Sequence, residues 1–142
     1  MTDLLAAEPL ILDRLRDRVA LARQVHGART FKAIPARTGA MPALYLIADG
    51  FQPLMRAGCE QAVEQVWLVV VAVRNLHDAE GGQGERREAG PLLFQVCQAL
   101  IGWQPVPELG AMHLIASPGS VFSDEQALFS LRFAMRFVLC GV

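Results

Sequence analysis

The chain has 142 residues, of which 53% are hydrophobic and 19% are charged. That length suits one domain spanning residues 1–142, and the apolar content excludes an intrinsically disordered chain. The 13 basic and 14 acidic residues give a formal net charge of −1. This balance excludes a protein that binds nucleic acid tightly and non-specifically through the phosphates, because such proteins have an excess of basic residues.

The first predicted element is an amphipathic helix over residues 8–26. Pro9 suits the first helical turn, where a backbone N–H is not needed, and Gly27 is typical of the residue that ends a helix. The apolar residues of this segment recur at helical spacing and predict one buried face: Ile11, Leu12, Leu15, Val19, Ala22 and Val25.

Short extended segments follow the helix. Residues 30–34 predict a short strand, and residues 37–42 predict a loop. Residues 43–48 predict a second strand, which an Asp-Gly pair ends, and residues 51–59 are expected to be an irregular connection.

Residues 61–75 carry the strongest strand signal of the chain. From Val66 to Val73 the residues are apolar on both faces and mostly β-branched, which is typical of a central strand covered on both sides. A fully extended segment of this length would reach roughly 50 Å, at about 3.3 Å per residue. We therefore expect part of it to bend or to project as a hairpin arm.

Residues 75–88 are polar and rich in glycine, and they predict a flexible surface loop. A Gly-Pro pair then opens a second predicted helix over residues 92–101. The buried stripe expected on that helix consists of Leu93, Val96, Cys97 and Leu100. Residues 111–116 predict a strand, and residues 117–124 predict a loop.

The last predicted strand covers residues 128–139, where apolar and other residues alternate. The face expected in the core carries Phe129, Leu131, Phe133, Met135, Phe137 and Leu139. The opposite face carries Arg132 and Arg136, which we expect either in solvent or at a subunit contact or channel wall. The predicted fold is α+β in the order α-β-β-β-α-β-β, with two helices on one face of a mixed, largely antiparallel sheet of four to five strands.

No motif for catalysis or metal binding is recognisable. His26, His77 and His113 have no second His or Cys at a spacing typical of metal ligands. The glycines of residues 81–84 are not followed by the Lys-Ser or Lys-Thr of a phosphate-binding loop, and no serine lies in a GxSxG motif. The sequence therefore predicts no catalytic residue, no metal and no cofactor.

The cysteines and apolar runs predict the compartment. Cys59, Cys97 and Cys140 are far apart in sequence and form no CxxC motif, so we expect neither a zinc site nor a redox pair but a reducing environment. The first residues do not resemble a signal peptide, and the longest apolar run, residues 66–73, is far shorter than the roughly 20 residues that span a bilayer. We expect a soluble protein made inside the cell, with no membrane association.

The order and content of these segments resemble the tail terminator proteins of long-tailed bacteriophages and prophages, including the minor tail protein U type. The segments that carry the resemblance are PLILDRLRDRV, ALYLIADG, EQVWLVVVAVRN, LLFQVCQALIGWQP and LFSLRFAMRFVL, which together extend from residue 8 to residue 139. The resemblance is one of pattern and of the phrase ALIGWQP, not of a catalytic signature.

This resemblance implies a structural virion protein that forms a hexameric ring with itself. The ring caps the tail tube, stops its polymerisation and offers a surface to the head–tail connector, while the genome passes through without sequence-specific binding. The residues expected at subunit or partner contacts are Arg86, Arg87, Trp103, Arg132 and Arg136. Two alternatives stay open: another ring protein of the head–tail region, and a small cytoplasmic enzyme or ligand-binding domain, which would need a pocket with convergent polar groups.

Overall fold

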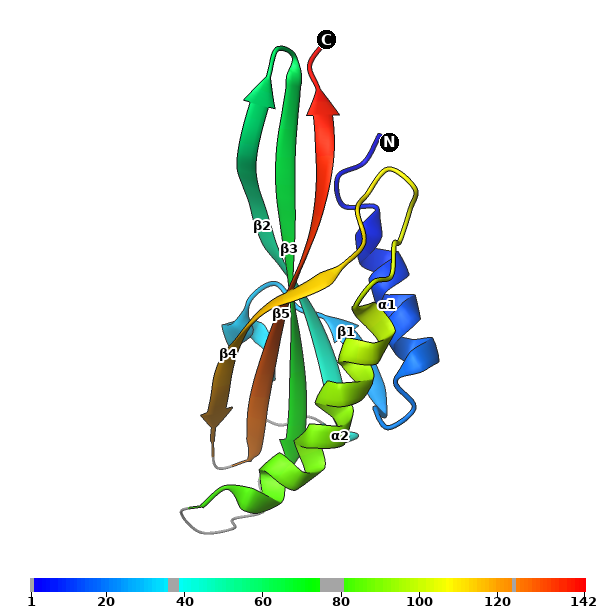
Figure 1. Cartoon of the computed structure of the whole chain (residues 1–142). Coiled ribbons are helices and arrows are strands. Elements are labelled where there is room, and N and C mark those ends of the chain that lie inside the picture. The colour runs from blue at the N-terminus through cyan, green and yellow to red at the C-terminus, as the bar shows by residue number, and fades with distance from the viewer. Residues whose placement is uncertain (1, 36–38, 75–80, 124) are drawn as a thin grey trace.

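The computed structural model describes residues 2–35, 39–74, 81–123 and 125–142 (Figure 1). Along the chain lie α1 (Ala7–Arg18), β1 (Gln24–Gly27), the 3-10 turn η1 (Phe31–Ala33), β2 (Ala43–Ala57), β3 (Glu60–Arg74), α2 (Gln83–Leu100), β4 (His113–Phe122) and β5 (Gln126–Cys140). The strands form one sheet in the order β1-β2-β3-β5-β4, in which β1 runs parallel to β2 and the other neighbours are antiparallel. The predicted α+β class and element order are confirmed.

Both helices pack on the same face of the sheet, over the halves of β2, β3 and β5 that lie lower in Figure 1. Alternate residues of the central strands point to this face because side chains alternate along a strand. Trp67 of β3 and Phe133 of β5 are paired in register, and neither is exposed. They occupy the same core as Ile11 and Leu15 of α1 and Val96 of α2.

A smaller apolar cluster covers part of the opposite face. Tyr45 and Ile47 of β2 and Val70 of β3 pack there against the segment that contains η1, which contributes Ile34 and Phe31. The central strands are therefore covered on both sides, as the apolar run in β3 predicted.

The far ends of the three longest strands project beyond the helices as an arm (Figure 1). We define the arm as residues 51–57 of β2, 60–62 of β3 and 138–140 of β5, which continue the same ladder to the pairs Ala57↔Glu60 and Glu60↔Cys140. Every residue from 48 to 60 is exposed. The projecting arm expected from the length of the third strand is confirmed, and the C-terminal strand belongs to it.

The predicted N-terminal helix over residues 8–26 is too long. α1 ends at Arg18, and residues 24–27 instead form β1, whose backbone pairs with Ala43–Leu46 of β2. Val25 is buried in either arrangement, so its apolar character does not distinguish a helix from a strand. The strand predicted over residues 30–34 is also wrong, because Ala33 N donates to Thr30 O and closes a 3-10 turn.

β2 continues nine residues beyond the predicted end at residue 48. The Asp-Gly pair does not end the strand, because the register shifts between Ala48 and Phe51 accommodate it as an irregularity in the ladder. Gly50 has a φ of 83°, which suits such a bulge. The irregular connection predicted for residues 51–59 is therefore wrong, since most of it is paired with β3.

The second helix begins nine residues earlier than predicted. Residues 83–88 were expected in a flexible loop but form the first turns of α2, and Pro91 lies inside the helix. The loop residues 75–80 lie outside the described part of the chain. The helix buries Glu85, Ala89, Leu92, Val96, Ala99 and Leu100, a stripe that differs from the predicted one because Leu93 and Cys97 are only partly buried.

The end of the chain follows the prediction for β5 but not for β4. β5 presents Phe129, Leu131, Phe133, Met135 and Phe137 to the helix-covered core, as their alternation predicted. Residues 117–122 were expected in a loop but extend β4 to Phe122, through two register shifts beside Ala116. Pro118 and Gly119, which usually interrupt strands, lie in this irregular stretch.

Candidate assembly surfaces

Trp103, a predicted contact residue, is half-buried against the main core at the exit of α2. The guanidinium carbon of Arg14 lies 5.2 Å from the centroid of its ring, and Arg14 Nε donates a 2.9 Å hydrogen bond to Ala99 O. Trp103 therefore contributes to joining α1 to the end of α2 within one subunit through a cation–π contact. A contact with another subunit stays a prediction.

Arg86 and Arg87 are exposed on the first turns of α2. Arg86 Nη2 donates a hydrogen bond to Gly81 O, just before the helix begins at Gln83. Both guanidinium groups are therefore carried by a helix rather than by the flexible loop that the sequence predicted. Among the described residues, no interaction joins Arg86 or Arg87 to Trp103 or to the arginines of β5.

Arg132 and Arg136 lie on the sheet face opposite the helices, as predicted, because they alternate with Phe133 and Phe137. Arg132 Nε lies 3.1 Å from Asp49 Oδ2 on β2, and Arg136 Nε lies 3.0 Å from Glu64 Oε2 on β3. The two ion pairs differ in exposure. The Asp49 side chain is 42% exposed, whereas that of Glu64 is only 12% exposed.

This difference predicts unequal effects of removing the two arginines. Arg136→Ala should lower the free energy of unfolding by about 1 kcal/mol, because the largely buried Glu64 carboxylate loses its charged hydrogen-bond partner. Arg132→Ala should lower it by less than about 0.5 kcal/mol, because water can hydrate Asp49 instead. Urea unfolding midpoints measure both values. Adding Glu64→Gln to Arg136→Ala should recover most of the loss, and equal losses for the two single variants would contradict this interpretation.

The arm carries several exposed apolar side chains. Met55 is 75% exposed, Val138 is 58% exposed, and Phe51 and Leu54 are each exposed by more than two fifths. Leu54, Met55 and Val138, with Ala62, Arg136 and Phe137, line a shallow groove of about 560 Å³. Apolar side chains gathered on a projection with no core of its own are typical of a protein–protein contact.

A second apolar surface follows β4, the edge strand of the sheet on the side of β5. Leu114, Ile115, Val121 and Phe122 are each at least 40% exposed. An edge strand that displays apolar side chains is a favourable place for another chain to dock. The sequence missed both surfaces, because Leu54 and Met55 fell in a predicted connection and Val121 and Phe122 in a predicted loop.

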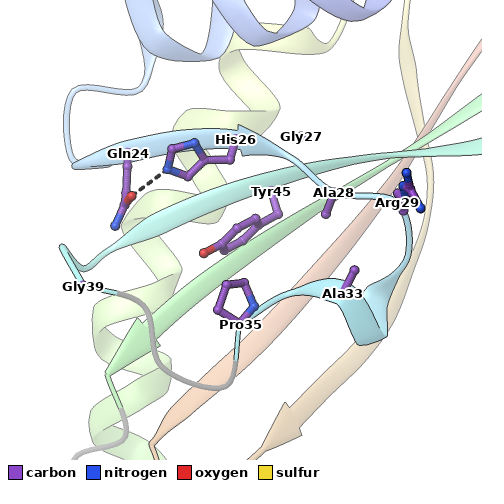
Figure 2. A pocket seen from close by; sticks show the side chains of 9 residues that line it. All are labelled: Gln24, His26, Gly27, Ala28, Arg29, Ala33, Pro35, Gly39 and Tyr45. Carbon is purple, nitrogen blue, oxygen red and sulfur yellow. Dashed lines mark hydrogen bonds between the residues drawn. The ribbon is translucent and has the colours of Figure 1, made fainter.

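A hollow of about 500 Å³ lies between β1 and the segment before β2. Figure 2 shows His26 and Gln24 turned toward each other, with the ring of Tyr45 between His26 and Pro35 and with Arg29 at the far end. His26 Nε2 and Gln24 Oε1 are 2.6 Å apart, and Gln24 Nε2 donates to Ala40 O. The side chains of Gln24 and His26 therefore interact with each other and with the backbone, and they do not converge on the hollow as a binding site would require.

Neither a candidate metal site nor a candidate membrane-spanning helix is present in the part of the chain that the structure describes. In that part of the chain no three His, Cys, Asp or Glu side chains gather closely enough to hold a metal ion. No helix found there is long and apolar enough to span a membrane.

The structure brings together two cysteines that lie far apart in the sequence. Cys59 and Cys140 are 81 residues apart in the chain, yet their Sγ atoms lie 2.9 Å apart at the tip of the arm. Their spacing in sequence carried no signal of this proximity, because it arises from the long-range pairing of β3 with β5. Cys97 lies apart from them on α2, where burial raises the pKa of its thiol.

Residues 1–140 match the profile of the phage tail terminator protein family. Among curated protein sequences none is significantly similar to this chain. Among solved structures, a chain from the virion of a native gene transfer agent particle is similar, with a TM-score of 0.57 and 16% sequence identity. The alignment covers 91% of this chain and 92% of that chain, so the two share a fold over nearly their whole length.

Proposed function

Because this chain belongs to the phage tail terminator family, a family of structural proteins of the virion tail, we propose that its subunits form a closed ring of six that caps the tail tube. The ring stops further addition of the tube protein and presents its other side to the head–tail connector. The role is structural and needs no catalytic residue. The observation that carries the proposal is the pairing of a family match over residues 1–140 with two separate exposed apolar surfaces on one subunit.

Two different surfaces suit a ring better than a twofold dimer. In a ring, each contact joins one surface of a subunit to a different surface of the next, and the chain of contacts closes when the rotation divides a full circle. The arm, with Met55 and Val138, and the edge strand β4, with Val121 and Phe122, are the two surfaces that this arrangement requires. We propose that the arm of one subunit docks against β4 of its neighbour.

The charges fit a channel through which DNA passes without being held. The net charge of −1 gives little electrostatic attraction to phosphates. Arg132 and Arg136 are each paired with a carboxylate of the same subunit, which reduces the positive field that they present. They therefore suit a subunit contact or a channel wall, and we propose no sequence-specific contact with the genome.

Growth of tail tubes in the presence of the purified protein tests the proposed role. Tube protein that polymerises in vitro should stop growing when this protein is added, at about six copies per tube end. Electron microscopy should show shorter tubes that each carry a ring at one end. The free subunit need not form rings, because the tube can template them. Tubes of unchanged length without end-bound protein would contradict the proposal.

A further inference from the structure

The tip of the arm holds two thiols in contact. Cys59 lies in the turn between β2 and β3, and Cys140 is the last residue of β5. Their Sγ atoms are 2.9 Å apart, and both residues are exposed. The backbone holds them in place, because Glu60 pairs with Cys140 and Gly141 N donates a 2.8 Å hydrogen bond to Cys59 O.

This separation is close to that of a covalent bond. A disulfide has a sulfur–sulfur distance of about 2.05 Å, so the two atoms need to approach by less than about 1 Å. Small rotations of two exposed side chains can supply that movement without a change in the strand ladder. The third cysteine, Cys97, is half-buried on α2 and does not compete for either thiol.

We propose that Cys59 and Cys140 form an intramolecular disulfide that ties the end of β5 to the tip of the β2–β3 hairpin. The oxidant is a small-molecule disulfide such as oxidised glutathione. One cysteine thiolate attacks it and releases one glutathione thiol, and the second cysteine then attacks the mixed disulfide and releases the other. Two protein thiols and one glutathione disulfide thus yield one protein disulfide and two glutathione thiols.

The surroundings set the conditions for the reaction. The hydrogen bond with the Cys59 thiol, desolvation and the nearby Glu60 carboxylate all raise the pKa of Cys140. Because the thiolate is the attacking species, the exchange is faster in mildly alkaline buffer. A reducing cytosol keeps such thiols free, so the bond forms once the assembled particle reaches an oxidising medium. The inference does not depend on the proposed ring.

Non-reducing peptide mapping and thiol counting of the full chain test the proposal. After incubation with oxidised glutathione at about pH 8.5, the count of free thiols should fall from three to one, and the Cys59 and Cys140 peptides should be found linked. The melting temperature should rise by about 5–10 °C, because the bond closes a long loop in the unfolded chain. A reducing agent should reverse the rise. Cys97→Ser is the matched control and should keep both the linkage and the rise.

Cys140→Ser and Cys59→Ser should each abolish the linkage and the rise in melting temperature. Because both variants are expected to give the same result, a folding defect in one of them does not decide the test. Three outcomes would overturn the proposal: three thiols that remain free, glutathione adducts that do not resolve into a linkage, or dimers linked between chains. A linkage without a rise in melting temperature would overturn the claim that it ties the arm.

Discussion

Phe133→Ala is expected to lower the free energy of unfolding by about 3–5 kcal/mol, enough to unfold a marginally stable domain. Phe133 is fully buried, faces Trp67 across β3 and β5, and lies in the core beneath both helices. The substitution removes a large apolar contact area and leaves a cavity in the middle of a sheet, where the paired backbones cannot close around it.

The matched control is Phe94→Ala on α2. Phe94 is 63% exposed, so its removal should change the free energy of unfolding by less than about 1 kcal/mol. Urea or thermal unfolding of both variants measures the difference. A loss below about 1 kcal/mol for Phe133→Ala would mean that the centre of the core lies elsewhere.

Met55→Glu is expected to give a stable subunit that no longer assembles. Met55 is 75% exposed in the single subunit, so a carboxylate there stays hydrated and the melting temperature should hardly change. In a ring, the same carboxylate would be buried against the neighbouring subunit without a partner. That cost is about 3–5 kcal/mol at each contact, which weakens association more than about a hundredfold.

Gln98→Glu provides the control for added charge, because Gln98 is exposed on α2 away from the arm. It should terminate tubes as the original protein does, while Met55→Glu should fail to do so at equal concentration. Circular dichroism confirms that both variants are folded. Normal tube termination by a folded Met55→Glu protein would contradict the proposal that the arm lies at the contact between subunits.

The fold was predictable where one pattern dominated. The alternation in residues 128–139 identified β5 and both of its faces, and the apolar run in residues 66–73 identified the central strand. The predicted element boundaries were wrong where pairing between distant strands outweighed the local sequence pattern. Residues 24–27 continue a helical pattern but pair with β2, and the Asp-Gly pair that usually ends a strand is accommodated in a bulge.

The candidate surfaces were less predictable than the fold. The faces of Arg132 and Arg136 followed from alternation, but their partners did not, since Asp49 was expected to end a strand and Glu64 lies 72 residues from Arg136. The contact between Cys59 and Cys140 depends on the same long-range register. The exposed apolar side chains of the arm were not predicted, because the mixed polar and apolar sequence around Pro53 does not resemble a strand.

The most direct test of the proposed ring is an electron cryo-microscopy map of the head-proximal end of tails that contain this protein. The account predicts six copies in a closed ring at the end of the tube, with the arm of each copy, including Met55 and Val138, against β4 of the next. A single copy, a twofold dimer, or a ring whose arms point into solvent would contradict it.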